Sequence, residues 1–195
     1  MYKILFVHDF LSSPLDPFTT ALIERLKGVK VLVPVLPINP YQAMLKVQHI
    51  YEDEQPDLIV GWGSGCILAQ QFTLEKRILI NPVCQVSSVL SEYLYSRNVT
   101  PRPADLGYAN RVSDLVLSST VIESWMEMES QQFLKSKNRE EICHVLFWMD
   151  KNTDNAVRYQ RYYPSLTYVP GFDFLDKSSL KGIAGLIQVV LEGDD

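Results

Sequence analysis

The sequence has little of what several protein classes need. Its three cysteines, Cys66, Cys84 and Cys143, are scattered and form no CxxC pair. This argues against a disulfide framework or a cysteine-rich zinc site and is typical of a reducing cytoplasm. No apolar run approaches the roughly 20 residues that a membrane-spanning helix needs. There is no long basic run, and 18 Lys and Arg stand against 23 Asp and Glu. We therefore expect a cytoplasmic protein with neither a nucleic-acid nor a membrane partner.

The chain does have the length and composition of one globular domain. It has 195 residues, of which 47% are hydrophobic and 21% charged, and one core can serve all of residues 1–195. Short apolar runs alternate with segments of helical periodicity. This alternation predicts an α/β fold with three α/β/α layers around a mainly parallel sheet. The expected strands are 4–7, 29–35, 58–60, 77–80, 144–148 and 166–169.

Residues 85–143 break the alternation. Their pattern is mostly helical, and the stretch is too long for a plain connection. We interpret it as a helical cap inserted over the carboxyl ends of the strands. Trp125, Met126 and Met128 share a stripe within it, which either lines an apolar pocket or belongs to the core.

The segment Gly61-Trp62-Gly63-Ser64-Gly65 lies between a predicted strand and a predicted helix. This frame is that of the nucleophile elbow of α/β-hydrolases, in which the central residue carries the nucleophile. Here the central residue is Gly63, which has no side chain. Ser64 follows one position later, either as a displaced nucleophile or as an early residue of the helix.

Further short motifs surround this elbow in a specific order. The first strand ends in His8-Asp9-Phe10 with Ser12-Ser13-Pro14 after it, Asn81-Pro82 follows the fourth strand, and a Tyr162-Tyr163 pair comes later. With these motifs along most of its length, the chain resembles the small YqiA-type bacterial esterases of the α/β-hydrolase superfamily. The resemblance implies the α/β-hydrolase fold.

Carrying the family's catalytic roles over position by position shows several departures. The catalytic serine falls on Gly63, and the glycine that shapes the oxyanion loop falls on Asp9. The catalytic acid falls near Asp150, with Asp154 as the alternative if the loop register differs. The family's catalytic histidine lies in the loop after the last strand, which here contains no histidine. Loss of a triad member costs orders of magnitude in rate, and a carboxylate beside the oxyanion site repels the developing charge.

We therefore expect a catalytically degenerate protein that binds a small molecule or a protein partner. The alternative is an active serine carboxylesterase in which Ser64 works with a non-standard base such as His8. The residues expected to line the pocket are His8, Asp9, Phe10, Gly63 and Asp173, and the candidates for catalysis are Ser64 and Asp150.

The same residues suggest two other kinds of ligand, a nucleotide and a divalent cation. Nucleotide binding at Gly61-x-Gly63-x-Gly65 lacks the third glycine of the dinucleotide fingerprint, because residue 66 is cysteine. The carboxylates of Asp9, Asp150 and Asp173 are of the type that a divalent cation prefers, but their spacing forms no ligand motif. No cofactor and no metal are expected.

Overall fold

The computed structural model of the chain describes residues 1–10, 12–95, 118–134, 142–148, 153–163, 166–169 and 175–193. Within them, six parallel strands form one sheet in the order β2-β1-β3-β4-β5-β6. The strands are β1 (Lys3–Val7), β2 (Lys30–Leu32), β3 (Leu58–Trp62), β4 (Arg77–Ile80), β5 (Cys143–Trp148) and β6 (Leu166–Val169). The helices are α1 (Pro17–Ile23), α2 (Pro40–Glu54), α3 (Gly65–Ala69), α4 (Val86–Tyr95), α5 (Ser119–Gln131), α6 (Thr153–Gln160) and α7 (Lys177–Glu192).

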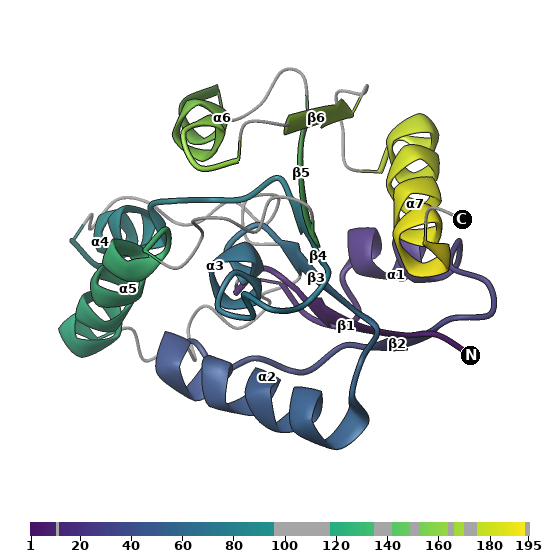
Figure 1. Cartoon of the computed structure of the whole chain (residues 1–195). Coiled ribbons are helices and arrows are strands. Elements are labelled where there is room, and N and C mark those ends of the chain that lie inside the picture. Colours follow the sequence, from purple (N-terminus) through teal and green to yellow (C-terminus); the bar gives the residue numbers. More distant parts are fainter. Residues whose placement is uncertain are drawn as a thin grey trace.

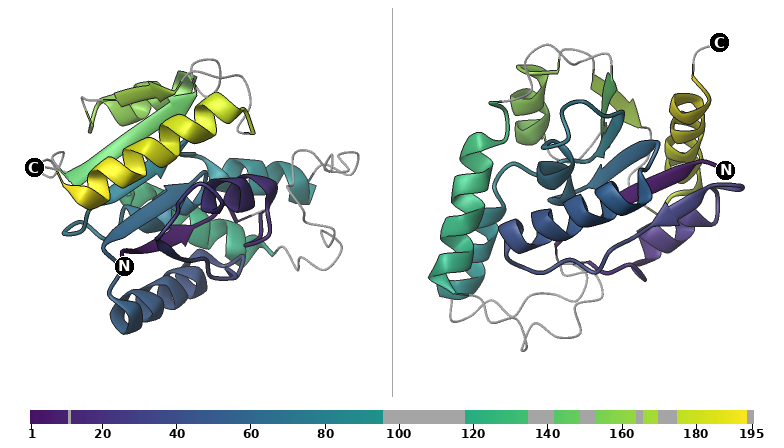
Figure 2. Two further views of the ribbon diagram at one scale, coloured as in Figure 1. Left: turned by 90° about the vertical axis from the view of Figure 1, so that its right-hand side faces the viewer. Right: turned by 60° about the horizontal axis from the view of Figure 1, so that its bottom comes forward.

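Helices cover both faces of the sheet, so the three-layer prediction is confirmed. Helices α1 and α7 lie on one face, and α2, α3, α4, α5 and α6 lie on the other (Figures 1 and 2). Alternate residues of β1 point into two separate cores: Leu5 and Val7 into the core under α2 and α3, Ile4 and Phe6 into the core under α1 and α7. Both faces of a parallel sheet are buried in this way because helices connect its strands.

Strand β2 is shorter than the sequence predicts. The apolar run 29–35 indicated a longer strand, but ladder pairing with β1 covers only Lys30–Leu32. β2 lies at the edge of the sheet. Pro34 and Pro37 follow it, and a proline has no N–H to donate to a strand ladder.

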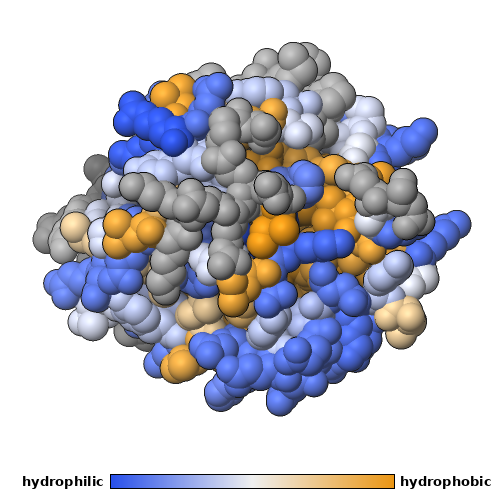
Figure 3. All heavy atoms as spheres, in the orientation of Figure 1, coloured by the Kyte–Doolittle hydropathy of each residue, from blue (hydrophilic) through white to orange (hydrophobic). Residues whose placement is uncertain are grey.

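Helix α2 has one buried and one exposed face. Ala43 and Val47 are buried against the core, whereas the outer face is hydrophilic (Figure 3). His49 is exposed on this helix. No helix in the described part of the chain has the length and apolar character to cross a membrane.

Two helices of the predicted insertion, α4 and α5, belong to the packed body of the protein. α5 contacts both α4 and α2. Trp125 is 1% exposed, and its Nε1 donates a hydrogen bond to the Ile38 carbonyl at 3.0 Å. Met128 is buried as well, whereas Met126 is 57% exposed. Residues 96–117 and 135–141 lie outside the described residues, so the role of 85–143 as a cap stays a prediction.

Truncation of Trp125 tests whether α5 is part of the core. We expect Trp125→Ala to lower the free energy of unfolding by about 3 to 5 kcal/mol, because it leaves a large buried cavity. Met126→Ala, the adjacent and mostly exposed position, should change it by less than about 1 kcal/mol. Urea unfolding of the two variants measures the difference. Equally small losses would show that α5 is not a core element.

Candidate active site

The segment 61–65, predicted to be a nucleophile elbow, makes a sharp turn between β3 and α3. Gly63 stands between β3 and α3 with φ +59°, in the left-handed region that favours glycine. Its N–H donates to the Ile80 carbonyl at 3.0 Å, and its own carbonyl accepts from the N–H groups of Cys66 and Val83 at 3.3 Å each. The chain therefore reverses sharply at Gly63 and enters α3 directly.

The two outer glycines allow backbone segments to approach closely, as the motif predicts. A Cβ atom on Gly65 would lie 2.1 Å from the Val7 carbonyl oxygen of β1. A Cβ atom on Gly61 would lie 2.8 Å from the Cα of Cys66 in α3. Side chains at these positions would push β1 and α3 away from the elbow, so their absence is a packing requirement.

The Asp9 carboxylate occupies the space beside Gly63. A Cβ atom on Gly63 would lie 2.1 Å from Asp9 Oδ2 and 3.0 Å from Asp9 Cγ. The Ser64 hydroxyl donates to Asp9 Oδ1 at 3.1 Å, and the Ser64 N–H lies 3.5 Å from Asp9 Oδ2. Any side chain at position 63 would therefore project into the carboxylate that Ser64 holds in place.

Ser64 is buried in contacts between the elbow and the loop after β1. The residue is 1% exposed. Besides donating to Asp9, its Oγ accepts a hydrogen bond from the Phe10 N–H at 2.8 Å. Ser64 stands at the N-cap position of α3 but makes no capping hydrogen bond with its side chain. Its hydroxyl thus joins two loops rather than facing solvent.

His8 is also buried and fully engaged. Nδ1 lies 2.7 Å from the Asp9 carbonyl oxygen and 3.0 Å from Ser12 Oγ, and Nε2 lies 2.8 Å from the Pro34 carbonyl oxygen. The ring therefore connects its own loop to the segment after β2. The other two histidines of the chain lie in α2 and near the amino end of β5.

Comparison with known proteins gives structural neighbours only. Neither a protein-family model nor a curated protein matches the sequence. Est1E from Butyrivibrio proteoclasticus, in a structure with ferulic acid bound, superposes with a TM-score of 0.64 at 10% identity, over 98% of this chain and 87% of that one. A putative hydrolase from Agrobacterium vitis S4 superposes with a TM-score of 0.61 at 14% identity, over 97% of this chain and 87% of that one. The chain has the α/β-hydrolase fold.

A third neighbour with this fold is named for an assembly. The glycosylation-associated protein (Gap123) complex from Streptococcus agalactiae superposes with a TM-score of 0.53 at 10% identity. The match covers 99% of this chain and 42% of that one. At such identities the comparisons establish the α/β-hydrolase fold and nothing finer.

The other predicted site residues are only partly placed. Phe10 packs against Trp125 of α5, with ring centroids 5.7 Å apart. Asp150 and Asp173 lie outside the described residues, so their place in a pocket stays a prediction. Among the described residues, no group of three His, Cys, Asp or Glu side chains is arranged to hold a metal ion.

Cys66 follows the elbow and is the nearest thiol to it along the chain. It is fully buried, and its Sγ donates to the Ile80 carbonyl at 3.5 Å. Burial raises the pKa of the Cys66 thiol well above its ordinary value. A neutral, enclosed thiol is a core group rather than a nucleophile.

Asp9 and Gly63 are two separate departures along the sequence, but they meet in the folded chain. Val7 pairs with Gly61 across β1 and β3, so both chains leave the sheet side by side at the same level. The sequence contained a signal for this contact. It has a carboxylate at the position of the oxyanion-loop glycine and a glycine at the position of the nucleophile, and these two positions are neighbours in the fold.

Restoring a serine at position 63 tests this contact. We expect Gly63→Ser alone to lower the free energy of unfolding by about 1 to 3 kcal/mol, because its Cβ displaces the Asp9 carboxylate. In the double variant Asp9→Gly/Gly63→Ser the clash is absent, so the loss should be smaller than the sum of the two single losses. Denaturant unfolding of the four proteins measures the coupling. Strict additivity would contradict the proximity.

A second substitution tests the close approach at Gly65. Gly65→Ala should destabilise the protein by about 3 kcal/mol or more, because the new methyl group meets the rigid backbone of β1. Gly185→Ala is the matched control: this glycine lies in α7 with no atom within 4 Å of the added Cβ. There, alanine should stabilise by about 0.5 to 1 kcal/mol through helix propensity. The two substitutions should therefore shift the midpoint temperature of thermal unfolding in opposite directions, downward for Gly65→Ala and upward for Gly185→Ala.

Proposed function

We propose that this chain is a non-hydrolytic protein with the α/β-hydrolase fold, which acts by binding a small molecule or a protein partner. The observation that carries the proposal is the Asp9 carboxylate lying against Gly63. It fills the space that the nucleophile side chain of an esterase would take, and it does so with a group of the wrong charge for an oxyanion site.

The chemistry of ester hydrolysis needs a nucleophile, a base and donors for the oxyanion together. Position 63 supplies no nucleophile. A serine hydroxyl reacts only when a base takes its proton, and both ring nitrogens of His8 already contact other oxygen atoms. The site therefore supports recognition better than turnover.

One comparison supports a binding role, and the cysteines point to a compartment. One structural neighbour is described as a protein complex rather than as a hydrolase, which shows that the fold also occurs in assemblies. All three cysteines of the chain are free and buried. We propose that the protein works in a reducing compartment such as the cytoplasm, where free thiols persist.

One contact favours the alternative, an active esterase that uses Ser64. Its hydroxyl donates to the Asp9 carboxylate, which is the arrangement of a nucleophile beside a base. However, a carboxylate is a weaker base than the imidazole that takes the serine proton in a catalytic triad. The 1% exposure of Ser64 also leaves little room for a substrate carbonyl.

Covalent labelling separates these functions. A fluorophosphonate probe bonds its phosphorus to an activated serine oxygen and releases fluoride. We expect the intact mass of the wild-type protein to stay unchanged after incubation, as with Ser64→Ala, while an active serine esterase in the same buffer is labelled fully. A mass increase that Ser64→Ala abolishes would overturn the proposal and establish Ser64 as a nucleophile. Circular dichroism confirms that the tested proteins are folded.

A further inference from the structure

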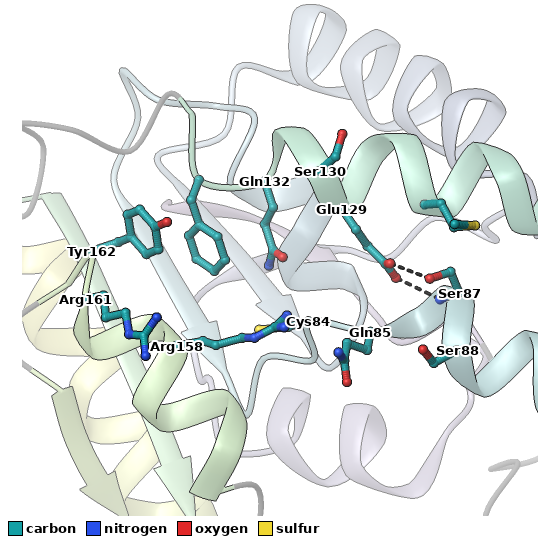
Figure 4. Close-up of a pocket in the computed structure, with 12 residues that line it drawn as sticks. Cys84, Gln85, Ser87, Ser88, Glu129, Ser130, Gln132, Arg158, Arg161 and Tyr162 are labelled. Atoms are coloured by element: carbon teal, nitrogen blue, oxygen red, sulfur yellow. Dashed lines mark hydrogen bonds between the residues drawn. The ribbon is translucent and has the colours of Figure 1, made fainter.

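A cavity of about 470 Å³ lies between α4, α5 and α6, away from the elbow. Figure 4 shows side chains from all three helices and their adjoining turns around it. No described residue of the elbow or of the loop after β1 is among those that line it. The cavity is therefore a second site, whose properties do not depend on whether the elbow is inert.

Two arginines give the cavity a positive charge. Arg158 of α6 and Arg161, one residue beyond its end, both line it and are exposed. Within the described part of the chain, neither guanidinium forms an ion pair with a carboxylate. The chain as a whole carries a net charge of −5. Two arginines at one cavity are therefore opposite in sign to the net charge of the protein.

Among the described residues that line the cavity, one carboxylate is present, and it already accepts hydrogen bonds. Glu129 of α5 accepts hydrogen bonds from the N–H and the hydroxyl of Ser87, near the start of α4 (Figure 4). A carboxylate near a helix N-terminus is stabilised by the helix dipole. Glu129 therefore holds α4 against α5 and forms no ion pair with either arginine.

The thiol beside Arg158 does not neutralise its charge either. The Arg158 guanidinium lies close enough to the Cys84 thiol to act on its pKa. Burial raises the pKa of Cys84 to about 11, although Arg158 opposes this shift. At neutral pH the thiol is therefore uncharged, and the positive charge of Arg158 stays available to a ligand.

The polar side chain of Gln132 also lines the cavity. Gln132 is 3% exposed, and its Nε2 donates to Gln70 Oε1 at 2.8 Å and to Tyr159 Oη at 2.7 Å. Figure 4 shows the Gln132 side chain pointing into the space between α5 and α6. These buried hydrogen bonds hold the Gln132 side chain in one orientation beside the cavity.

A flat aromatic pair forms one wall of the cavity. The rings of Phe133 and Tyr162 stack with centroids 4.2 Å apart and an angle of 6° between their planes, and both residues line the space. Such a pair gives a planar ligand an apolar surface, since aromatic rings favour offset stacking and edge contacts.

We propose that this cavity binds a small aromatic anion, a carboxylate or phosphate whose charged group is held by Arg158 and Arg161. A guanidinium binds both groups in a bidentate manner. The ring of the ligand packs against Phe133 and Tyr162. The proposal goes beyond a general binding function, because it names a site and a ligand class.

Titration calorimetry with three probes tests the proposal. The probes are 4-hydroxybenzoate, phenyl phosphate and the neutral 4-hydroxybenzamide. We expect saturable binding of at least one of the two anions and none of the amide. Arg158→Gln and Arg161→Gln should each weaken that binding at least about tenfold, as for the loss of one charge-assisted hydrogen bond. Lys181→Gln, which removes one exposed charge on α7, should leave it within about twofold of wild type.

The outcomes are decisive in both directions. Tighter binding of phenyl phosphate than of 4-hydroxybenzoate assigns a phosphate ligand, and the reverse assigns a carboxylate. No saturable binding of either anion, or binding that Arg158→Gln/Arg161→Gln retains in full, overturns the proposal. Because both arginines are exposed, the double variant should fold, and its circular dichroism verifies this. Neither result bears on labelling at Ser64, so this proposal and the proposed function fail independently.

Discussion

The contact between the Asp9 carboxylate and Gly63 is the constraint on which the rest of the candidate active site depends. It leaves room at position 63 for glycine only, and the Asp9 carboxylate accepts a hydrogen bond from the Ser64 hydroxyl. The Ser64 oxygen in turn accepts a hydrogen bond from the Phe10 N–H, so the loop after β1 is fastened to the elbow. An esterase of this fold needs this space for its nucleophile side chain. Here a group of the chain itself occupies it, and the proposed loss of hydrolysis follows from occupied space as much as from missing side chains.

The elbow nevertheless keeps its full backbone geometry, because that geometry has a structural role. Gly65 lets α3 touch β1, and Gly61 lets β3 touch α3. Both contacts are required by the packing of the central strands, whatever chemistry the site performs. A scaffold can therefore persist when its catalytic groups do not, which is why the fold by itself does not establish an activity.

Local patterns predicted most of the fold but not the contacts that define the sites. Continuous apolar runs such as 4–7 mark buried parallel strands, and the glycine pentad marks the elbow. The stretch 29–35 predicted too long a strand, since ladder pairing ends at Leu32, before Pro34 and Pro37. The meeting of Asp9 with Gly63 depends on side-chain directions in segments 54 residues apart. The cavity depends on how three helices pack, and the pattern that places Arg158 on α6 says nothing about which helices lie opposite.

Helix α5 connects the closed elbow with the open cavity. Its residues Trp125, Glu129 and Gln132 follow one another at spacings of four and three, which places them along one side of the helix. Trp125 packs against Phe10 of the loop after β1, whereas Glu129 and Gln132 line the cavity. The same helical stripe therefore supports both regions. The core position of Trp125 limits how far α5 can move, and this restraint holds in place the cavity wall that Glu129 and Gln132 form, as the proposed binding site requires.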